Sequence, residues 1–281
     1  MICDRAGDGR FPPGPGGFDL ETPGPGVWEP TLPAMVNDPG AWLQDVRPFL
    51  LRHPRRFLPP GPFPLRSRRY AEEFNEVKTI GRKISATRSG EQTTAAQFWG
   101  GPSNAVFTWS KLVRSLAAAR PGWSTVQSAR FYALMYLNAA DSLIVTWKGK
   151  DKFMFWRPIT AIRRADTDGN PATEREESWL PLINNPPYPD HPSGLSAFGA
   201  SNVATAQEVF GTDVVEFSAT STPVGITRTY ERLSEAVNEI VDARVWSGIH
   251  FRNADVQGAR VGSDVARWRR DHGFLRPLHR R

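Results

Sequence analysis

Residues 188–197 read Tyr-Pro-Asp-His-Pro-Ser-Gly-Leu-Ser-Ala, a proline-rich turn that runs directly into an alanine-rich segment. Because proline cannot continue a helix and serine is a favoured N-cap, this stretch predicts a helix that begins at Ser193 and Gly194. The unpaired backbone N–H groups and positive dipole end of a helix N-terminus suit phosphate-like anions. Ser193 would add a hydroxyl donor there, and Gly194 would let an anion approach the backbone. An ordinary serine-capped helix start is the alternative reading.

A basic pair precedes this turn. Residues 150–158 read Lys-Asp-Lys-Phe-Met-Phe-Trp-Arg-Pro, which places Lys150 and Arg157 seven residues apart. Gly149 precedes the pair, and Pro158 disfavours helical geometry at Arg157. We therefore expect a helix to end near Gly149 and the two cations to converge from a helix end and a loop. A solvent-exposed basic pair is the alternative for this segment alone.

A third segment, residues 243–255, reads Ala-Arg-Val-Trp-Ser-Gly-Ile-His-Phe-Arg-Asn-Ala-Asp. Arg244 and His250 are six residues apart, so an unbroken helix would place them on different sides. We expect Gly248 to break the helix and His250 to open the next one, which would aim both side chains inward. A half-buried histidine among aromatic neighbours is the alternative.

The chain from Ser67 onward is typical of helices. Ser67 can cap a helix that Gly81 ends, and apolar residues recur every three or four positions in several later segments. The further helices predicted are 92–99, 103–119, 124–148, 196–210, 228–246 and 251–270, and only 214–217 looks strand-like. The sequence therefore predicts an all-α helical bundle over residues 66–281.

The first 65 residues have a different composition. They hold 14 of the 25 prolines and nine of the 24 glycines, in runs that cannot continue a helix or fill a central strand. Aromatic residues such as Trp28, Trp42 and Phe57 are spaced through the segment and would be costly to leave in water. Residues 1–65 are therefore expected to form an irregular, extended strap packed on the helical domain.

Composition excludes several classes of protein. A chain of 281 residues with 40% hydrophobic residues suits a globular protein, and Cys3, as the sole cysteine, excludes a disulfide framework or a thiolate zinc site. The start MICDRAGDGRF lacks the basic-then-apolar pattern of a signal peptide, and polar residues interrupt the longest apolar stretch, 131–147. We expect a soluble, cytoplasmic protein without a membrane partner.

The positive charge indicates an anionic partner. The net charge is +6, and 29 of the 35 cationic residues are arginine, whose guanidinium suits forked binding of oxyanions. The basic segment 267–281, with Trp268 and Phe274, offers nucleic-acid binding as an alternative. It is the weaker alternative, because the other arginines are scattered among acidic residues and no nucleic-acid motif appears.

Taken in order, Lys-x6-Arg-Pro, Pro-Ser-Gly and Arg-x5-His resemble the signature of the vanadium-dependent haloperoxidases and the type 2 phosphatidic acid phosphatase superfamily. FWRPITAIR, from Phe155, and WSGIHFR, from Trp246, resemble the bacterial haloperoxidase-related branch. The resemblance extends from about residue 28 to about residue 266. It implies a helical bundle of the haloperoxidase/acid phosphatase type.

The resemblance also implies a cage for vanadate, or for phosphate as its analogue. The anion-binding residues would be Lys150, Arg157, Ser193, Gly194 and Arg244. His250 would be the axial ligand of vanadate in an enzyme that oxidises halide with hydrogen peroxide, or the nucleophile of an acid phosphatase acting on a phosphomonoester. His250 and Arg244 are thus the catalytic candidates.

Two positions depart from the family pattern. Leu195 stands where the family has the acid–base histidine after Pro-Ser-Gly, so an intact anion site with impaired turnover is expected unless His191 substitutes. The family's aspartate four residues after the histidine falls on Ala254, and we expect Asp255, with Asn253 nearby, to orient His250 instead. Relatives carry a further helical region upstream, so exposed apolar surface and a homo-oligomer are additional expectations.

Overall fold

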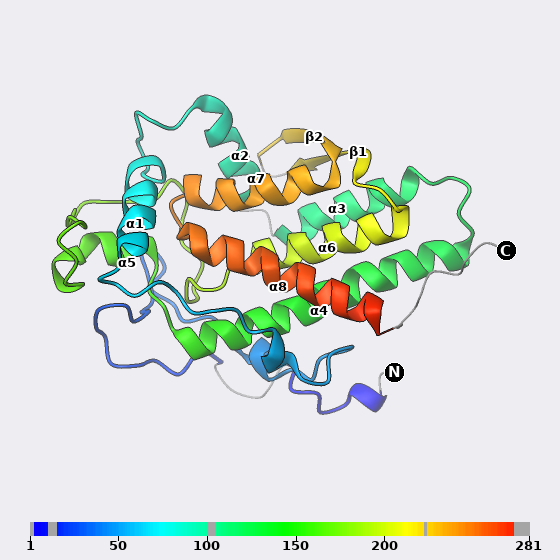
Figure 1. The fold of residues 1–281 in the computed structure, drawn as a ribbon, viewed down its shortest axis with the longest axis horizontal. Helices are drawn as coiled ribbons and strands as arrows, with labels where there is room; N and C mark the ends of the chain where they lie inside the picture. The colour runs from blue at the N-terminus through cyan, green and yellow to red at the C-terminus, as the bar shows by residue number, and fades with distance from the viewer. Residues whose placement is uncertain (1–2, 11–15, 101–104, 222–223, 273–281) are drawn as a thin grey trace.

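The computed structural model describes residues 3–10, 16–100, 105–221 and 224–272 (Figure 1). It confirms the predicted all-α helical bundle, to which one β-hairpin is added. The helices are α1 (Arg68–Ile80), α2 (Gly90–Gly100), α3 (Ala105–Ala118), α4 (Thr125–Phe153), α5 (Pro158–Arg163), α6 (Gly194–Phe210), α7 (Leu233–Trp246) and α8 (Arg252–Asp271). The strands are β1 (Val214–Ser221) and β2 (Ile226–Arg232).

Helix α6 is the centre of the bundle and contacts α4, α7 and α8 (Figure 1). At two glycines of α8 the backbones of the two helices approach each other directly. A Cβ atom on Gly258 would lie 2.3 Å from the Ser193 carbonyl oxygen, and one on Gly262 would lie 2.1 Å from that of Ala197. Only glycine fits at such distances, so these two residues set the spacing of the two helices.

The two largest clusters of buried side chains stabilise the bundle. One lies among α2, α3, α4, α6, α7 and the hairpin, with Trp99, Trp109 and Phe131 among its largest members. The other joins α1 and α5 to the bundle through Trp156 and Trp179. Each large aromatic side chain buries a large apolar area, so these residues contribute strongly to the stability of the bundle.

The helix from Ser67 begins as predicted. The Ser67 hydroxyl accepts a hydrogen bond from the Tyr70 N–H at 3.2 Å, and Gly81 follows the last residue of α1. Helices α2, α6 and α8 match their predicted ranges to within two residues. The predicted helix 103–119 corresponds to α3, although Ser103 lies outside the described residues.

Helix α4 is longer than predicted. It continues through Gly149 to Phe153 and ends at Met154, whose φ is 39°. Gly149 does not break the helix. It makes room for Pro192, because a Cβ atom there would lie 2.7 Å from the proline ring. A glycine inside a helix is tolerated where another segment packs this closely.

The β-hairpin corrects the prediction for the region after α6. The strand predicted at 214–217 extends to Ser221, and residues 226–232 form its antiparallel partner, although 228–232 were predicted as the start of a helix. Exposed and buried positions alternate along β1, and threonine and serine hydroxyls pair across the strands, as Thr220 and Thr227 do at 2.8 Å. Such cross-strand hydroxyl pairs and the β-branched threonines favour a strand, so α7 begins only at Leu233.

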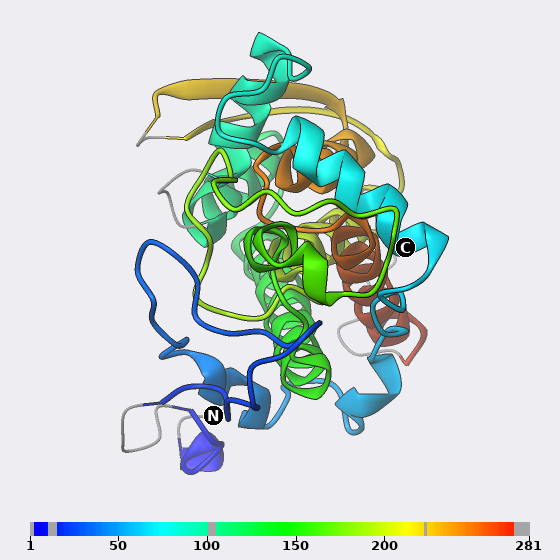
Figure 2. The same ribbon diagram turned by 90° about the vertical axis from the view of Figure 1, so that its left-hand side faces the viewer.

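The N-terminal segment crosses the end of the bundle where α5 lies (Figure 2). The buried carboxylate of Asp141 on α4 accepts hydrogen bonds from the N–H groups of Phe49, Leu50 and Leu51 at 2.6, 2.7 and 2.9 Å. Trp28 is buried against Phe18 and donates its backbone N–H to the Met154 carbonyl oxygen. These contacts support our proposal that residues 1–65 act as a strap on a helical domain.

The end of α8 offers little for base stacking. Trp268 stacks on His272 at 4.1 Å between ring centroids, and Arg269 is fully buried in an ion pair with Glu208. Phe274 lies outside the described residues. Within the described part of the chain, no helix is both long enough and apolar enough to span a membrane.

Candidate oxyanion site

The predicted site residues meet at one end of the bundle, where α4 and α7 end and α6 and α8 begin (Figures 1 and 2). They come from the last turns of α4 and α7, the residue before α5, the start of α6 and the turn before α8. Their side chains are between 0% and 6% exposed: Lys150, Arg157, Ser193, Arg244 and His250. Charged side chains are seldom buried this deeply without a partner.

The turn before α6 holds two of the cations. Lys150 Nζ donates to the carbonyl oxygens of Pro189 and Asp190 at 2.7 and 3.2 Å, and Arg157 Nε donates to that of Tyr188 at 2.8 Å. The Tyr188 ring lies 4.7 Å from Lys150 Nζ and 5.0 Å from the Arg157 guanidinium. As predicted, Lys150 reaches the turn from a helix end and Arg157 from a loop.

His250 is held between an aspartate and an arginine. Its Nδ1 lies 2.7 Å from Asp190 Oδ1, and its Nε2 lies 3.3 Å from Arg157 Nη1. A carboxylate on Nδ1 fixes the proton there and leaves the lone pair on Nε2, which faces the Arg157 guanidinium. The expectation that Asp255 orients His250 is therefore wrong, because Asp190, in the turn before α6, occupies that position.

Asp255 serves the start of α6 instead. Its Oδ1 accepts the Ser196 hydroxyl at 2.8 Å, and the Ser193 hydroxyl lies nearby without a hydrogen bond of ordinary geometry. Burial raises the pKa of Asp255 to about 6, against the opposing effects of Arg244, Ser193 and Ser196. Asn253 is buried beside it and accepts a hydrogen bond from Gln257 at 3.3 Å. Within the described residues, neither side chain is therefore joined to the imidazole by a hydrogen bond.

His191 points away from the other site residues. Its Nε2 lies 2.9 Å from the Pro60 carbonyl oxygen, and its ring meets Phe153 edge to face. Burial lowers the pKa of His191 to about 4. The side chain therefore packs between α4 and the N-terminal segment, and the structure does not bring it to the position of the missing acid–base group.

Arg244 Nε is buried without a hydrogen-bond partner, and its side chain forms no hydrogen bond or ion pair within the described part of the chain. Its guanidinium is buried, and burial lowers its pKa. The Ser193 hydroxyl, at the start of α6, is also buried and makes no hydrogen bond with ordinary distance and angles. A buried donor left without an acceptor is costly, so these groups indicate a site built to hold an acceptor ligand.

The site holds more basic than acidic groups. Lys150 and two arginines face the carboxyl groups of Asp190 and Asp255, and burial raises the pKa of both acids and lowers that of Lys150. Burial also lowers the pKa of His250, and the three neighbouring cations lower it further. The imidazole is therefore neutral at neutral pH, as a ligand or a nucleophile must be.

The start of α6 provides backbone donors to the site. Ser193 is the N-cap residue, and the first N–H groups of the helix have no intrahelical acceptor. A Cβ atom on Gly194 would lie 2.9 Å from the Trp147 ring, so glycine is required for packing on α4. Leu195 is half-buried and packs against the main hydrophobic cluster, which leaves a non-titrating side chain in the first turn.

Sequence reasoning missed Asp190 and Tyr188. Both belong to the quoted turn 188–197, and Asp190 lies only three residues before Ser193. An acidic residue so close to the helix start was the available signal. The path of the turn, which brings this carboxylate back to His250, could not be read from spacing.

Known proteins resemble the chain in sequence and structure. The family model described as the VCPO second helical-bundle domain matches residues 130–274. Vanadium chloroperoxidase of Curvularia inaequalis is 29% identical over 230 residues, which cover 67% of this chain and 37% of that protein. The chain thus spans little more than a third of the length of this curated relative.

Solved structures share the fold. The first bacterial vanadium-dependent iodoperoxidase superposes with a TM-score of 0.79 at 26% identity, over 94% of this chain and 63% of that one. The holo-type bacterial vanadium-dependent chloroperoxidase superposes with a TM-score of 0.68 at 16% identity, over 88% of this chain and 61% of that one. At the latter identity the likeness concerns the fold alone.

Proposed function

Because this chain belongs to the vanadium haloperoxidase superfamily, whose second helical-bundle domain it matches over residues 130–274, we propose that its buried site binds vanadate. The observation that carries the proposal is Arg244, a buried guanidinium without a hydrogen-bond partner among the described residues. A multiply charged oxyanion would supply the acceptors that this group lacks.

The residues present fit such an anion. Lys150, Arg157 and Arg244 would offset the cost of burying its charge, which would be prohibitive without cations. Ser193 Oγ and the Gly194 N–H would donate to its oxygens, and His250 Nε2 would ligate it. Phosphate has the same tetrahedral shape and would compete for the same donors.

We propose halide oxidation with hydrogen peroxide as the activity of this site. Bound vanadate would supply the activation of hydrogen peroxide, while Asp190 holds the His250 ring and the cations stabilise developing negative charge. Leu195 neither gives nor takes a proton, so turnover is expected to be slow. An acid phosphatase that uses His250 as nucleophile would need the same anion-binding residues. It would also lack an acid–base side chain at position 195.

Calorimetric titration of orthovanadate into the purified protein tests the proposal. We expect one binding site, competition by inorganic phosphate, and halide oxidation that depends on added vanadate. Hydrolysis of a phosphomonoester that vanadate inhibits would instead identify a phosphatase. Absence of binding heat at several temperatures, in a sample whose circular dichroism is helical, would refute vanadate binding.

Asp190→Asn should weaken vanadate binding about 10- to 100-fold, because the partner of a ligating histidine fixes its tautomer and direction. The double variant Asp190→Asn/Ala254→Asp should recover part of the loss, since it restores an aspartate where the family has one. Binding is measured by calorimetry, and the His250 tautomer by nitrogen chemical shifts. An unchanged tautomer and affinity in Asp190→Asn would show that Asp190 does not position the ring.

A further inference from the structure

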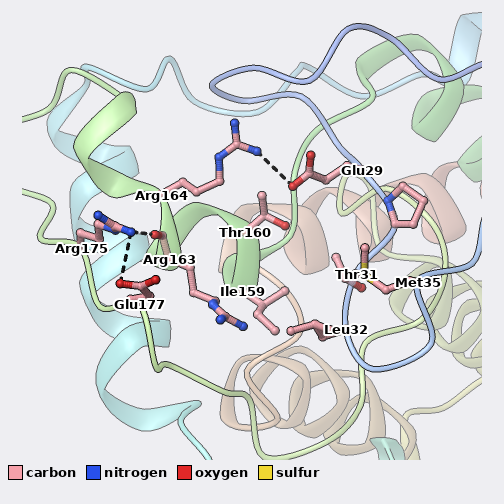
Figure 3. A pocket seen from close by; sticks show the side chains of 11 residues that line it. Glu29, Thr31, Leu32, Met35, Ile159, Thr160, Arg163, Arg164, Arg175 and Glu177 are labelled. Atoms are coloured by element: carbon pink, nitrogen blue, oxygen red, sulfur yellow. Dashed lines mark hydrogen bonds and ion pairs between the residues drawn. The ribbon is translucent and has the colours of Figure 1, made fainter.

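A cavity of about 390 Å³ lies on the outer face of α5, between residues 29–35 of the strap and residues 175–177 (Figure 3). None of the proposed vanadate-binding residues lines it. Its volume is in the range of small-molecule sites. It is therefore a place for a second ligand, separate from the oxyanion site.

The charges that line this cavity are paired, with one exception. Arg164 forms an ion pair with Glu29 at 3.0 Å, and Arg175 forms one with Glu177 at 3.4 Å. The guanidinium of Arg163 has no hydrogen bond or ion pair with the described residues, and Figure 3 shows it beside the apolar side chains. The cavity thus carries one arginine that no protein carboxylate in the described part of the chain neutralises.

Apolar side chains cover the opposite wall. Leu32 and Met35 of the strap are 43% and 58% exposed, and they face Ile159 of α5 across the cavity (Figure 3). Met35 has a φ of 51°, a left-handed conformation that is uncommon in residues other than glycine. Exposed apolar groups beside an unpaired cation are typical of a site for a ligand with both characters.

On one face of α5 lie a polar side chain, a charged side chain and an apolar side chain: Thr160, Arg163 and Ile159. Thr160 and Arg163 are three residues apart and Ile159 and Arg163 four, so all three side chains share one side of the helix. The Thr160 hydroxyl has no hydrogen-bond partner among the described residues, although its residue is only 7% exposed. The hydroxyl and the guanidinium could hold one acidic group together.

We propose that this cavity binds a small organic carboxylate with an apolar ring or chain. The carboxylate pairs with the Arg163 guanidinium, which offers two parallel N–H donors, and the Thr160 hydroxyl adds a third. The apolar part lies against Ile159, Leu32 and Met35. This binding does not depend on the proposed function of the oxyanion site.

Titration calorimetry with benzoate, and with neutral benzamide of the same shape, tests the proposal. We expect benzoate to bind at millimolar or lower concentration and benzamide to bind at least tenfold more weakly, since a hydrogen bond to a charged group contributes roughly 1.5–3 kcal/mol, or about 10- to 100-fold. Arg163→Gln should weaken benzoate binding by a similar factor. Arg260→Gln, an exposed position on α8, should leave it unchanged.

Three results would overturn the proposal. Benzamide that binds as tightly as benzoate would exclude a carboxylate site, and absence of benzoate binding would exclude this ligand class. Benzoate binding that survives in Arg163→Gln but is lost in Arg244→Ala would assign the carboxylate to the oxyanion site instead.

Addition of orthovanadate should leave benzoate binding to the wild-type protein unchanged.

Discussion

Arg244→Ala should lower the affinity for vanadate by a factor of about 10² to 10³. Loss of one partner from a buried, hydrogen-bonded charge pair costs about 2–5 kcal/mol or more, and Arg244 has no other partner in the described residues that would compensate. The same change removes a buried, unpaired charge from the free protein, so the stability of the free protein should not fall by a comparable amount. Calorimetry gives the affinity, and urea unfolding without vanadate gives the stability.

The matched control is Arg260→Ala. Arg260 is an exposed arginine on α8, and its loss changes the net charge by the same amount. Vanadate affinity should stay within about twofold of the wild-type value, because exposed charges interact weakly across solvent. Equal losses in both variants would show that the anion responds to net charge and not to a built site.

Leu195→His should raise the rate of halide oxidation about 10²- to 10⁴-fold, the usual contribution of a positioned acid–base group. Leu195 lies in the first turn of α6, two residues after Ser193, and is half-buried. The gain should appear in kcat, while vanadate affinity measured by calorimetry changes little. Steady-state rates with bromide and iodide, each with and without added vanadate, provide the measurement.

Leu195→Gln separates proton transfer from polarity at this position. Glutamine is polar and similar in size to leucine but does not titrate, so it should leave the rate near the wild-type value. The rate of Leu195→His should also follow pH through the titration of the new imidazole. A gain of equal size in Leu195→Gln, or a histidine variant with a flat pH profile, would contradict an acid–base role.

Most of the fold could be predicted because the periodicity of apolar residues and the capping residues act locally. Ser67 and Gly81 bound α1 as expected, and the helix breaks at Gly248, whose φ is 78°. The helix predicted from residue 228 was wrong over 228–232, because the strand character of these residues depends on pairing with β1, which is a tertiary contact. The prediction that a helix ends near Gly149 was wrong for a related reason. The close approach of Pro192 requires glycine at this position, and the helix continues through it.

The site was predictable where a residue type and its spacing carry the chemistry. The arginines, lysine and histidine of the three segments do meet at one end of the bundle, and Gly248 does separate Arg244 from His250. The identity of the carboxylate on His250 was not predictable from position. Asp255 is nearer to His250 in the sequence, but Asp190 is nearer in space because the turn before α6 folds back over Lys150 and Arg157.

The glycine contacts between α6 and α8 have a consequence for anion choice. Ser193 caps α6 and His250 lies two residues before α8, and the two helices meet closely at Gly258, where a Cβ atom would lie 2.3 Å from the Ser193 carbonyl oxygen. The backbone of a regular helix has no side-chain rotamers with which to adjust. The distance between Ser193 and His250 is therefore held constant. Among oxyanions of equal charge, size would then decide which one fits between these residues. A side chain added at Gly258 would change the spacing of α6 and α8, and with it the preferred anion size, without contacting the anion.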